Sequence, residues 1–452
     1  MRSPLNYYLN SQSSPLLFHL LNVGEGLMVL LILPDETTIL YDCNVIQEDK
    51  DWIIDYLKSN IPFRYSKEEK KDSQWIDIFV NSHRDQDHYR GLKEVRAVFD
   101  IKSIWDSGET GATTQDDDYK YYMQLRLDMM KKYGDDAVIV PTPSHYPLVE
   151  LGGAEIYCLC SSEALSDKIK SRRFKEIKEA KIQHTNSIVL MIQYAGRSIL
   201  LPSDSDWKAW KEKIVPDFKS TDLLKANILV ASHHGSRSFF TDETVNDTID
   251  PEQNPDNTYV DSIDYIDPSI VLIPCGKYES ASHPNKEALK IYKDKTANEQ
   301  VYTTYEKDSF CGFIDKSGNW TVVPARFKPS SNSSASFDIH CNVNYNNNRY
   351  KGTDGGKFPI DSSLEFSVSG RGGLTDPMSS VDVYWEVSNG GINSFHEHQE
   401  IYYKGSNEKG DNFEFRRAVA YEGRHLLRCR VKNKKKKLDV TKIFVVNGFK
   451  DS

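Results

Sequence analysis

The six residues HRDQDH at positions 83–88 crowd two histidines and two aspartates into one short stretch of chain. Imidazole nitrogens and carboxylate oxygens are the ligands that Zn²⁺ and Mn²⁺ prefer in proteins. An apolar run at residues 75–80, typical of a buried strand, leads almost directly into this stretch. Because a turn after a strand can aim several side chains at one point, we expect a metal-binding loop here. The alternative is a charged loop that happens to contain two histidines.

Three further clusters of polar residues follow short apolar runs later in the chain. Asp204 follows the run at 197–201, the pair His233 and His234 follows 228–231, and His283 stands before a proline beyond 270–273. Taken singly, these residues have simpler explanations, namely a turn carboxylate, two structural histidines and a surface turn. Ligands of open α/β sheets nevertheless gather beyond the ends of strands, so four such clusters favour one shared site.

The elements that must position these clusters mix strands and helices over about the first 326 residues. Apolar runs at 16–21, 27–33, 38–41 and 75–80 predict strands, and 187–194 with 197–201 predicts a hairpin around Ala195 and Gly196. Helical spacing appears at 51–59, 116–133 and 286–292, and the charged stretch 168–181 predicts a solvated helix. Cys158 and Cys160 alternate in a strand-like run and are expected to share one face. The fold class predicted for this region is α/β.

The composition changes at residues 327–337, FKPSSNSSASF, which are rich in serine and suit a linker between domains. Beyond it, residues 338–452 contain alternating or β-branched and aromatic runs separated by glycine, asparagine and serine. This pattern predicts a second domain, a small all-β sandwich.

The composition narrows the class of protein. The 452 residues exceed one ordinary core, and the net charge of −9 argues against a passive nucleic-acid-binding module. An acidic chain can still cut nucleic acid where metal ions supply the local positive charge. The seven cysteines include no CxxC pair, which predicts reduced, mostly buried thiols. No apolar run suits a membrane span and no secretion signal is apparent, so the sequence predicts a cytoplasmic protein without membrane attachment.

The motifs, taken in order, resemble the metallo-β-lactamase family, and in particular the hydrolase domain of ComEC-type competence proteins. That order is LNVGEG at 21–26, Asp42, HRDQDH, the pair Ser203 and Asp204, SHHGS at 232–236 and SHP at 282–284. The resemblance covers about residues 15–325. It implies an αββα sandwich over residues 1–326 with two divalent metal ions, Zn or Mn, at one edge.

The resemblance also implies roles for individual residues. His83 and Asp85 correspond to ligands of the first ion, Asp87 and His88 to ligands of the second, and Asp204 to the carboxylate that bridges them. Either His233 or His234 corresponds to the late histidine ligand, and His184, or in its place Asn186, to a further one. Asp42 corresponds to a carboxylate supporting the metal loop. The residues expected to act in catalysis are Asp87, which helps to take a proton from water, His234, and His283, which contacts substrate phosphate.

The sequence departs from the family pattern near the expected site. Asn22 and Leu27 stand where the family usually has aspartate, and Ser203 stands where it usually has glycine. These changes remove no principal ligand, but the first two bear on substrate choice or metal affinity.

The C-terminal domain resembles a second family, the sensor domain found beside nucleotide cyclases of bacterial anti-phage signalling. The motifs are VDVYWEVSNGG at 381–391, YEGRH at 421–425 and FVVN at 444–447. The resemblance implies a bound nucleotide or other small signal contacted by Trp385, Arg424 and His425. The alternative for Trp385 is a core tryptophan of the sandwich. The family's Leu-Arg-Gly segment is represented only by YKG at 403–405.

Together the two resemblances predict a metal-dependent nuclease, an effector of bacterial anti-phage defence that cuts DNA when a cyclic nucleotide or other small-molecule activator binds the C-terminal domain. Two alternatives stay open. One is a small-molecule phosphodiesterase that destroys a cyclic nucleotide with the same metal site. The other is a non-enzymatic sensor or scaffold, which predicts metal-poor protein. The sequence leaves open whether the chain forms a homo-oligomer.

Overall fold

The computed structural model describes residues 15–62, 64–67, 70–108, 116–161, 182–242, 248–276, 283–325, 336–354, 356–376, 380–389, 398–403, 414–420, 423–436 and 438–450. The stretch 168–181, predicted as a helix, and residues 326–335, most of the predicted linker, lie outside these ranges. The described chain forms two compact units. We call residues 15–49 with 75–325 the N-terminal unit, and residues 50–74 with 336–450 the C-terminal unit.

One sheet of the N-terminal unit has the strand order β17-β16-β1-β2-β3-β6-β7-β8. The chain enters it by antiparallel pairs and continues from β3 through β8 by parallel ones. Every residue of β2 and β3 is buried, as expected for strands covered on both faces. The strands are β1 (Leu16–Leu20), β2 (Val29–Ile32), β3 (Thr38–Tyr41), β6 (Trp75–Asn81), β7 (Asp100–Asp106), β8 (Val138–Ile139), β16 (Ser309–Ile314) and β17 (Trp320–Ala325).

The second sheet has the order β15-β14-β13-β12-β11-β10-β9, and the strands from β12 to β15 run parallel. The predicted hairpin is present, with Ala195 and Gly196 at φ 49° and 73° in its two-residue turn. The strands are β9 (Val149–Leu151), β10 (Ala154–Cys160), β11 (Val189–Tyr194), β12 (Arg197–Leu201), β13 (Ile228–Val230), β14 (Ile270–Ile273) and β15 (Val301–Thr303).

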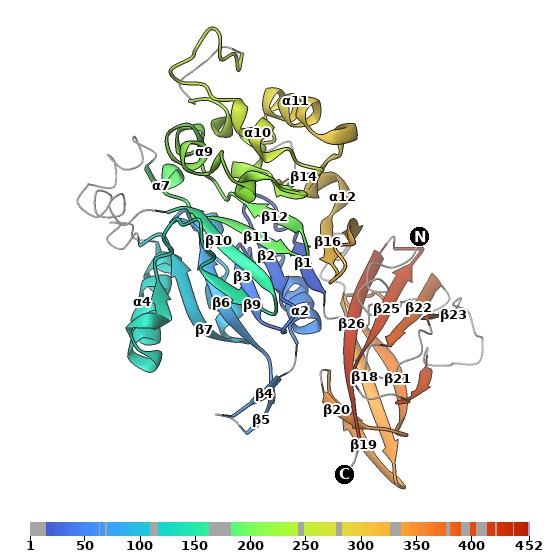
Figure 1. Ribbon diagram of the computed structural model, residues 1–452. Helices are drawn as coiled ribbons and strands as arrows, with labels where there is room; N and C mark the ends of the chain where they lie inside the picture. Colours follow the sequence, from blue (N-terminus) through green and yellow to red (C-terminus); the bar gives the residue numbers. More distant parts are fainter. Residues whose placement is uncertain are drawn as a thin grey trace. The chain divides into compact units, whose positions relative to one another are not determined.

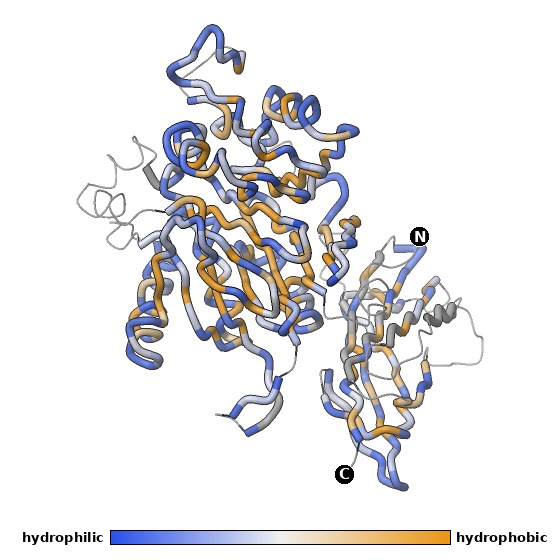
Figure 2. Tube along the Cα trace, viewed as in Figure 1, coloured by the Kyte–Doolittle hydropathy of each residue, from blue (hydrophilic) through white to orange (hydrophobic). Residues whose placement is uncertain are grey.

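Apolar side chains fill the space between the two sheets and between each sheet and its helices. A core that includes Phe18, Leu31 and Ile192 joins strands of both sheets, and a second core packs the other face of β10–β15 against helices. Figure 1 shows α4 beside the first sheet and α9, α10 and α11 beside the second, and Figure 2 shows how apolar the strands are. The helices are α3 (Leu92–Arg96), α4 (Asp117–Tyr133), α9 (Val215–Phe218), α10 (Asp261–Ile266) and α11 (Lys286–Lys295).

The prediction of a mixed α/β region is therefore confirmed, but one detail of it is wrong. Cys158 lies in the core between the sheets, whereas Cys160 packs on the helical side. The pairing of β10 with β11 shifts register between these two residues, which turns the second side chain to the opposite face. All seven cysteines are buried and unpaired, as predicted. None of the described helices has the length and apolar character that crossing a membrane requires.

The strands from residue 336 onward form the predicted all-β region of two sheets. Their orders are β19-β18-β21-β24 and β20-β26-β25-β22-β23, and a core that includes Phe366, Trp385 and Phe444 lies between them. Strand β18 begins at Ser336, so the last residues assigned to the linker belong to a strand. The strands are β18 (Ser336–Tyr345), β19 (Asn348–Gly352), β20 (Gly356–Pro359), β21 (Ser363–Arg371), β22 (Val381–Asn389), β23 (His398–Tyr403), β24 (Phe415–Ala418), β25 (Gly423–Asn433) and β26 (Leu438–Phe449).

The segment between β3 and β6 belongs to the C-terminal unit, although sequence places it within the first 326 residues. It contains α2 (Lys50–Asn60) and the hairpin of β4 (Arg64–Ser66) and β5 (Lys71–Ser73). Helix α2 packs against β26, and the Asp55 carboxylate lies 3.3 Å from the Lys442 ammonium. The chain thus leaves the N-terminal unit after β3 and returns to it at β6, and these two strands are neighbours in one sheet.

Candidate metal centre

The site residues stand just beyond the carboxyl ends of strands from both sheets. The 83–88 loop follows β6, Asp204 follows β12, and the pair His233 and His234 follows β13. His184 lies in the short helix α7 (Ile182–Thr185), immediately before β11. Parallel strands present their carboxyl ends at the same edge, so residues far apart in sequence meet there.

Two groups of three ligand-type side chains lie on either side of Asp204. In the first, the Asp85 Oδ2 atom is 3.5 Å from His83 Nε2 and 3.0 Å from His184 Nε2. In the second, Asp87 Oδ2 is 3.3 Å from His234 Nε2 and 3.8 Å from His88 Nε2. Within each group the ligand atoms lie within 4.8 Å of one another.

Asp204 contacts members of both groups. Its Oδ1 atom is 3.5 Å from His88 Nε2, and its Oδ2 atom is 3.8 Å from His83 Nε2 and 3.9 Å from His234 Nε2. The Asp204 side chain is buried, with 4% exposed, so its position is fixed by its surroundings. The predicted ligands converge around this carboxylate. Asp204 stands between the two groups, which is the position expected of a carboxylate that bridges two ions.

The chemistry of these atoms fits divalent cations. The Nε2 atoms of His83, His88 and His234 are buried and have no hydrogen-bond partner among the described residues. Their distances to the carboxylates of Asp87 and Asp204, from 3.3 to 3.9 Å, are long for hydrogen bonds. Two ligand atoms that each lie about 2.1 Å from one tetrahedral zinc ion are about 3.4 Å apart. Apart from the contact of His184 Nε2 with Asp85 at 3.0 Å, which is a hydrogen-bond distance, the spacing suits atoms that share an ion.

A polar network beneath the site orients the ligands. The Asp42 carboxylate lies 2.8 Å from His88 Nδ1 and accepts hydrogen bonds from the backbone and hydroxyl of Ser82 at 2.8 and 2.7 Å. The Ser203 hydroxyl donates to the Ser82 hydroxyl at 2.6 Å, and the latter lies 3.0 Å from His83 Nδ1. These contacts fix the Nδ1 atoms of His83 and His88, so the Nε2 atom of each ring faces the site. Outer-shell partners orient the histidine ligands of metal sites in the same way.

The later histidines are held in the same way. His234 Nδ1 lies 3.1 Å from the carbonyl oxygen of Pro274, and His233 Nδ1 lies 2.7 Å from the Ser238 hydroxyl. The two histidines differ in what their Nε2 atoms face. His234 completes the group of Asp87 and His88, whereas His233 Nε2 lies 3.6 Å from Asp204 Oδ2, on the side of His184. His184, Asp204 and His233 also form a group that could hold an ion, so which of the two histidines is the late ligand stays a prediction.

The charges in the cluster compensate one another. Burial alone would raise the pKa of Asp204, but the facing imidazoles of His233, His88 and His234 hold that pKa well below its usual range. Burial likewise opposes the charge on His88, yet Asp204 and Asp42 raise the pKa of this imidazole well above its usual value. Carboxylates that raise the pKa of buried histidines in this way create a negative potential, and such a site attracts cations.

Four residues at the site have a left-handed backbone, which side chains rarely adopt. Their φ angles are 56° at Asp42, 49° at Ser203, 47° at His233 and 56° at His234. Left-handed residues that are not glycine cost free energy and gather at functional sites. Ser203 is one of these four residues, and its hydroxyl enters the polar network beneath the site.

Other predicted positions differ in their distance from the ligands. The His283 ring is partly buried, and its centroid lies 5.5 Å from that of His233 and 6.3 Å from that of His234. Asn186 is fully buried and directs its amide to the Ser107 carbonyl oxygen at 3.4 Å, so His184 rather than Asn186 faces Asp85. The side chains of Asp85 and Asp87 are 38% and 33% exposed, which leaves this edge open to solvent.

Several supporting residues escaped the sequence analysis. Asn44 holds the LNVGEG turn against the metal loop, because its amide donates to the carbonyl oxygens of Val23 and Glu25 while Arg90 donates to it. Leu27, which the sequence analysis did name, is a core residue whose backbone amide donates to the carbonyl oxygen of Asp87 at 3.4 Å. Ser82 also escaped that analysis. The only sequence signal for its role was its position directly before His83, the first candidate ligand.

The three residues predicted to bind a signal in the C-terminal unit have different environments in the structure. Trp385 is 1% exposed and stacks on Phe415 with ring centroids 5.6 Å apart, in the place of a core tryptophan. His425 is 6% exposed and lines a hollow between the two sheets. The side chain of Arg424 lies outside the described part of the structure.

Comparison with known proteins bears on the C-terminal part of the chain. Residues 319–447 match the family model described as the adenylyl/guanylyl and SMODS C-terminal sensor domain, which supports the resemblance inferred for this region from sequence. No curated protein matches the chain.

Two solved structures share low similarity with this chain. The soluble domain of PmoD from Methylocystis sp. is 11% identical over 25% of this chain and 90% of that one, with a TM-score of 0.19. A chitin binding domain from Burkholderia pseudomallei is 10% identical over 22% of this chain and 58% of that one, with a TM-score of 0.15. At these scores neither likeness carries a conclusion about the fold.

Proposed function

We propose that the protein is a metallo-β-lactamase-fold phosphodiester hydrolase with two divalent metal ions, a nuclease acting on DNA in anti-phage defence. In this proposal a nucleotide-type signal bound by the C-terminal unit controls it. The observation that carries the proposal is the convergence of four histidines and two further carboxylates, Asp85 and Asp87, around the buried Asp204; the histidines are His83, His88, His184 and His234. The sensor-domain match supports the regulatory half.

The charge of the site supports an anionic substrate. Asp85, Asp87 and Asp204 contribute three negative charges, and two divalent ions would leave the centre with a net positive charge. A phosphodiester carries one negative charge and is drawn to such a centre, even though the chain as a whole has a net charge of −9. The exposed edges of Asp85 and Asp87 give a substrate access to it.

The two ions would polarise a phosphodiester and lower the pKa of a bound water, which is the chemistry such sites supply. His83, Asp85 and His184 would hold one ion, Asp87, His88 and His234 the other, and Asp204 would hold both. Asp87 lies at the exposed edge and is placed to accept a proton from an attacking water. His233 and His283 lie next to each other beside the cluster, with ring centroids 5.5 Å apart, and in this proposal their imidazoles would donate hydrogen bonds to phosphate oxygens.

The path of the chain supports control by the C-terminal unit. The segment 50–74 packs with that unit, through α2 against β26, and is continuous with the loops that hold Asp42 on one side and the 83–88 ligands on the other. A structural change in the C-terminal unit therefore has a covalent route to both the ligands and the carboxylate that orients them.

The test is cleavage of plasmid and single-stranded DNA by purified protein with Mn²⁺ or Zn²⁺, with and without cyclic mono- and dinucleotides. We expect cleavage that requires metal and rises with one of the nucleotides. Asp204→Asn should reduce the rate by at least the roughly 10- to 100-fold typical of losing an outer-shell partner of a metal site. Asp222→Asn is the control, because this carboxylate is 87% exposed.

The same experiment separates the alternatives. Hydrolysis of the cyclic nucleotides without cleavage of DNA would replace the nuclease by a small-molecule phosphodiesterase. Wild-type protein that contains no bound metal after exposure to Mn²⁺ or Zn²⁺ would leave only a non-enzymatic sensor or scaffold. Metal-loaded protein that cleaves neither class of substrate would refute the proposed activity.

A further inference from the structure

Residues 43–49, which we call the connector, lead from Asp42 beneath the candidate metal centre to the first residue of α2. The backbone amide of Cys43 donates to the carbonyl oxygen of His88, and the backbone amide of Gly91 donates to the carbonyl oxygen of Cys43, both at 2.8 Å. Because the Asp42 carboxylate also lies 2.8 Å from His88 Nδ1, this part of the chain holds both the ring and the backbone of His88.

The connector is also linked to Asp87, another member of the second group of candidate ligands. The Asn44 amide donates to the carbonyl oxygen of Leu27 at 3.1 Å, and the Leu27 amide donates to the carbonyl oxygen of Asp87 at 3.4 Å. A side chain at Gly91 would collide with Val45, so the connector also packs closely on the chain that follows the ligand loop. The connector therefore constrains two ligands of the second group.

The first group of candidate ligands is held by other parts of the chain. The Ser82 hydroxyl, just after β6, lies 3.0 Å from His83 Nδ1, and the Ser187 amide, just before β11, donates to the carbonyl oxygen of His184 at 3.1 Å. Asp42 reaches this group through the Ser82 hydroxyl. A displacement of the connector should therefore disturb the second group more than the first.

The connector continues into α2, which is held by the C-terminal unit. Helix α2 packs against β26, where the Asp55 carboxylate lies 3.3 Å from the Lys442 ammonium, and that ammonium lies 4.0 Å from the Asp338 carboxylate of β18. The side-chain amide of Gln74, just before β6, donates to the carbonyl oxygen of Lys58 near the end of α2 at 2.6 Å. A displacement of α2 would therefore be passed to the chain on both sides of it.

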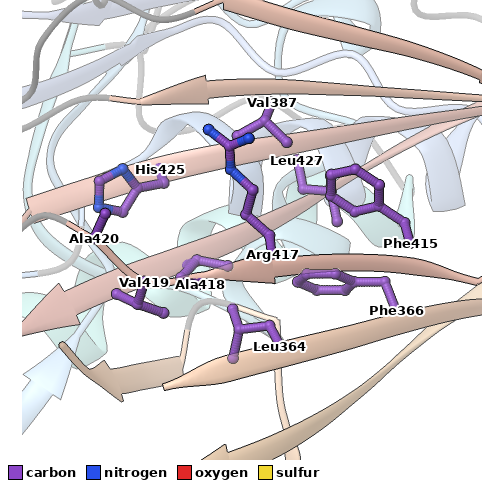
Figure 3. A pocket seen from close by; sticks show the side chains of 11 residues that line it. Leu364, Phe366, Val387, Phe415, Arg417, Ala418, Val419, Ala420, His425 and Leu427 are labelled. Carbon is purple, nitrogen blue, oxygen red and sulfur yellow. The ribbon is translucent and has the colours of Figure 1, made fainter. Parts of the chain in front are cut away.

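Strand β26 joins this contact to the core of the sandwich. Phe444 and Val446 are core residues, and Lys442 lies on the same face of the strand because side chains alternate along it. Figure 3 shows a small hollow in that core, beside Phe415 and Leu427, which Val446 also lines. Because packed interiors transmit strain, a change in the packing of this core would also displace Lys442.

We propose that α2 and the connector are the link through which the C-terminal unit controls the second metal position, by holding Asp87 and His88 in place. With α2 packed on β26, the connector fixes these two ligands, and weaker packing of α2 lowers the affinity of the second group for its ion. Because such coupling is reciprocal, an ion bound by the second group strengthens the packing of α2. The proposal rests on the metal centre and the control described in the proposed function, and it names the part of the centre that the control reaches.

The test separates the two metal positions with two background variants of the full-length protein. His184→Ala removes a ligand of the first group and leaves the second, and Asp87→Ala does the reverse. In each background the Zn²⁺ affinity is measured by competition with a chromogenic chelator, with and without Asp55→Lys. Asp55 is 45% exposed, and this change turns its attraction to Lys442 into repulsion. We expect Asp55→Lys to weaken Zn²⁺ binding about two- to fivefold in the His184→Ala background, as for the loss of an exposed ion pair, and to leave it unchanged in the Asp87→Ala background.

Lys434→Glu is the matched control. The Lys434 ammonium lies 2.6 Å from the Asp382 carboxylate in the same sandwich, so this change also places two like charges opposite each other, in a pair that does not involve α2. It should leave the Zn²⁺ affinity unchanged in both backgrounds. Asp55→Lys combined with Lys442→Glu restores opposite charges between α2 and β26, and it should recover the affinity lost in the His184→Ala background.

Hydrogen–deuterium exchange of the α2 amides provides a second readout. Zn²⁺ added to the His184→Ala protein should slow this exchange, whereas Zn²⁺ added to the Asp87→Ala protein should not. An equal loss of Zn²⁺ affinity from Asp55→Lys in both backgrounds, or no loss in either, would overturn the link and leave the metal centre in place. Wild-type protein that binds no Zn²⁺ would overturn the proposed function together with the link, and the titration of the unmodified chain reveals that outcome separately.

Discussion

Replacing Asp42 by asparagine keeps the shape of this fully buried side chain and removes its charge. The Asp42 Oδ2 atom accepts from the Ser82 hydroxyl at 2.7 Å and lies 2.8 Å from His88 Nδ1, while Oδ1 accepts from the Ser82 backbone amide at 2.8 Å. The Ser203 hydroxyl adds a fourth donor at 3.3 Å. All the surrounding groups can donate, so a carboxylate satisfies them and an amide does not.

In either orientation of the asparagine, its NH₂ group faces at least one donor. With NH₂ in the place of Oδ1 it faces the Ser82 backbone amide, which can only donate, and in the place of Oδ2 it removes the acceptor of His88 Nδ1–H and of the Ser82 hydroxyl. One unsatisfied buried donor costs about 1–3 kcal/mol, so stability should fall by at least that amount. Losing the carboxylate that orients His88 should weaken metal affinity about 10- to 100-fold.

The assay is metal affinity by competition with a chromogenic chelator, alongside the thermal unfolding midpoint of the metal-free protein. Asp77→Asn is the matched control. Asp77 also bridges β3 and β6, accepting from the Thr38 amide at 2.8 Å and from the Trp75 ring nitrogen at 2.7 Å, but on the part of β6 that precedes the site. Both variants should lose stability, and only Asp42→Asn should lose metal affinity. Wild-type metal affinity in Asp42→Asn, or an equal loss in both variants, would refute the reasoning.

Four further outcomes follow from the structure. His184→Ala should reduce bound metal from two ions to one per chain by elemental analysis, and two retained ions would remove His184 from the ligand set. Asp106→Ala should cost about 3 kcal/mol in chemical denaturation because it leaves the largely buried Arg126 guanidinium, 11% exposed, without its carboxylate, and Arg126→Met in the same chain should recover much of the loss. Burial raises the pKa of Asp100, but hydrogen bonds led by the one from Lys102 lower it to about 2. Its folded pKa lies below its unfolded value of 3.8, so a contribution of about 1 kcal/mol is present above about pH 4 and disappears towards pH 2. Asp100→Asn should therefore weaken the pH dependence of the free energy of unfolding between about pH 4 and pH 2. An unchanged pH dependence would show that Asp100 does not cause it. Chelation with EDTA should lower the thermal midpoint if the metals bind the folded chain, and a midpoint insensitive to EDTA would count against a resident metal.

Prediction from sequence succeeded where a single local pattern was enough to determine the structure. Residues 116–133 show helical spacing, and α4 begins at Asp117 because the Asp116 side chain accepts from the Asp118 amide and caps it. The hairpin of β11 and β12 followed from two adjacent residues suited to a tight turn. In the same way, polar residues placed after apolar runs predicted which side chains would meet, because parallel strands bring their carboxyl ends to one edge.

Local patterns failed where tertiary contacts decided the outcome. A register shift separates Cys158 from Cys160, and no spacing in the sequence announces it. His233 and His234 have different partners because two consecutive left-handed residues make their side chains diverge, and no local pattern in the sequence indicates this. The segment 50–74 has ordinary helical and strand patterns, but its grouping with the C-terminal unit depends on β26, which is distant in sequence.

Hydrogen bonds between the two sheets and the loops at their ends also position the candidate metal ligands. The Tyr41 hydroxyl, at the end of β3, lies 2.6 Å from the carbonyl oxygen of Ile188, just before β11, and 3.2 Å from that of Leu201, at the end of β12. Ser203, just after β12, donates to Ser82, just after β6. The register between the sheets is therefore fixed by polar contacts directly beneath the ligand atoms. It follows that a substitution in this layer changes stability and ligand geometry together, whereas a ligand at the exposed edge, such as Asp87, can be changed with less effect on the fold.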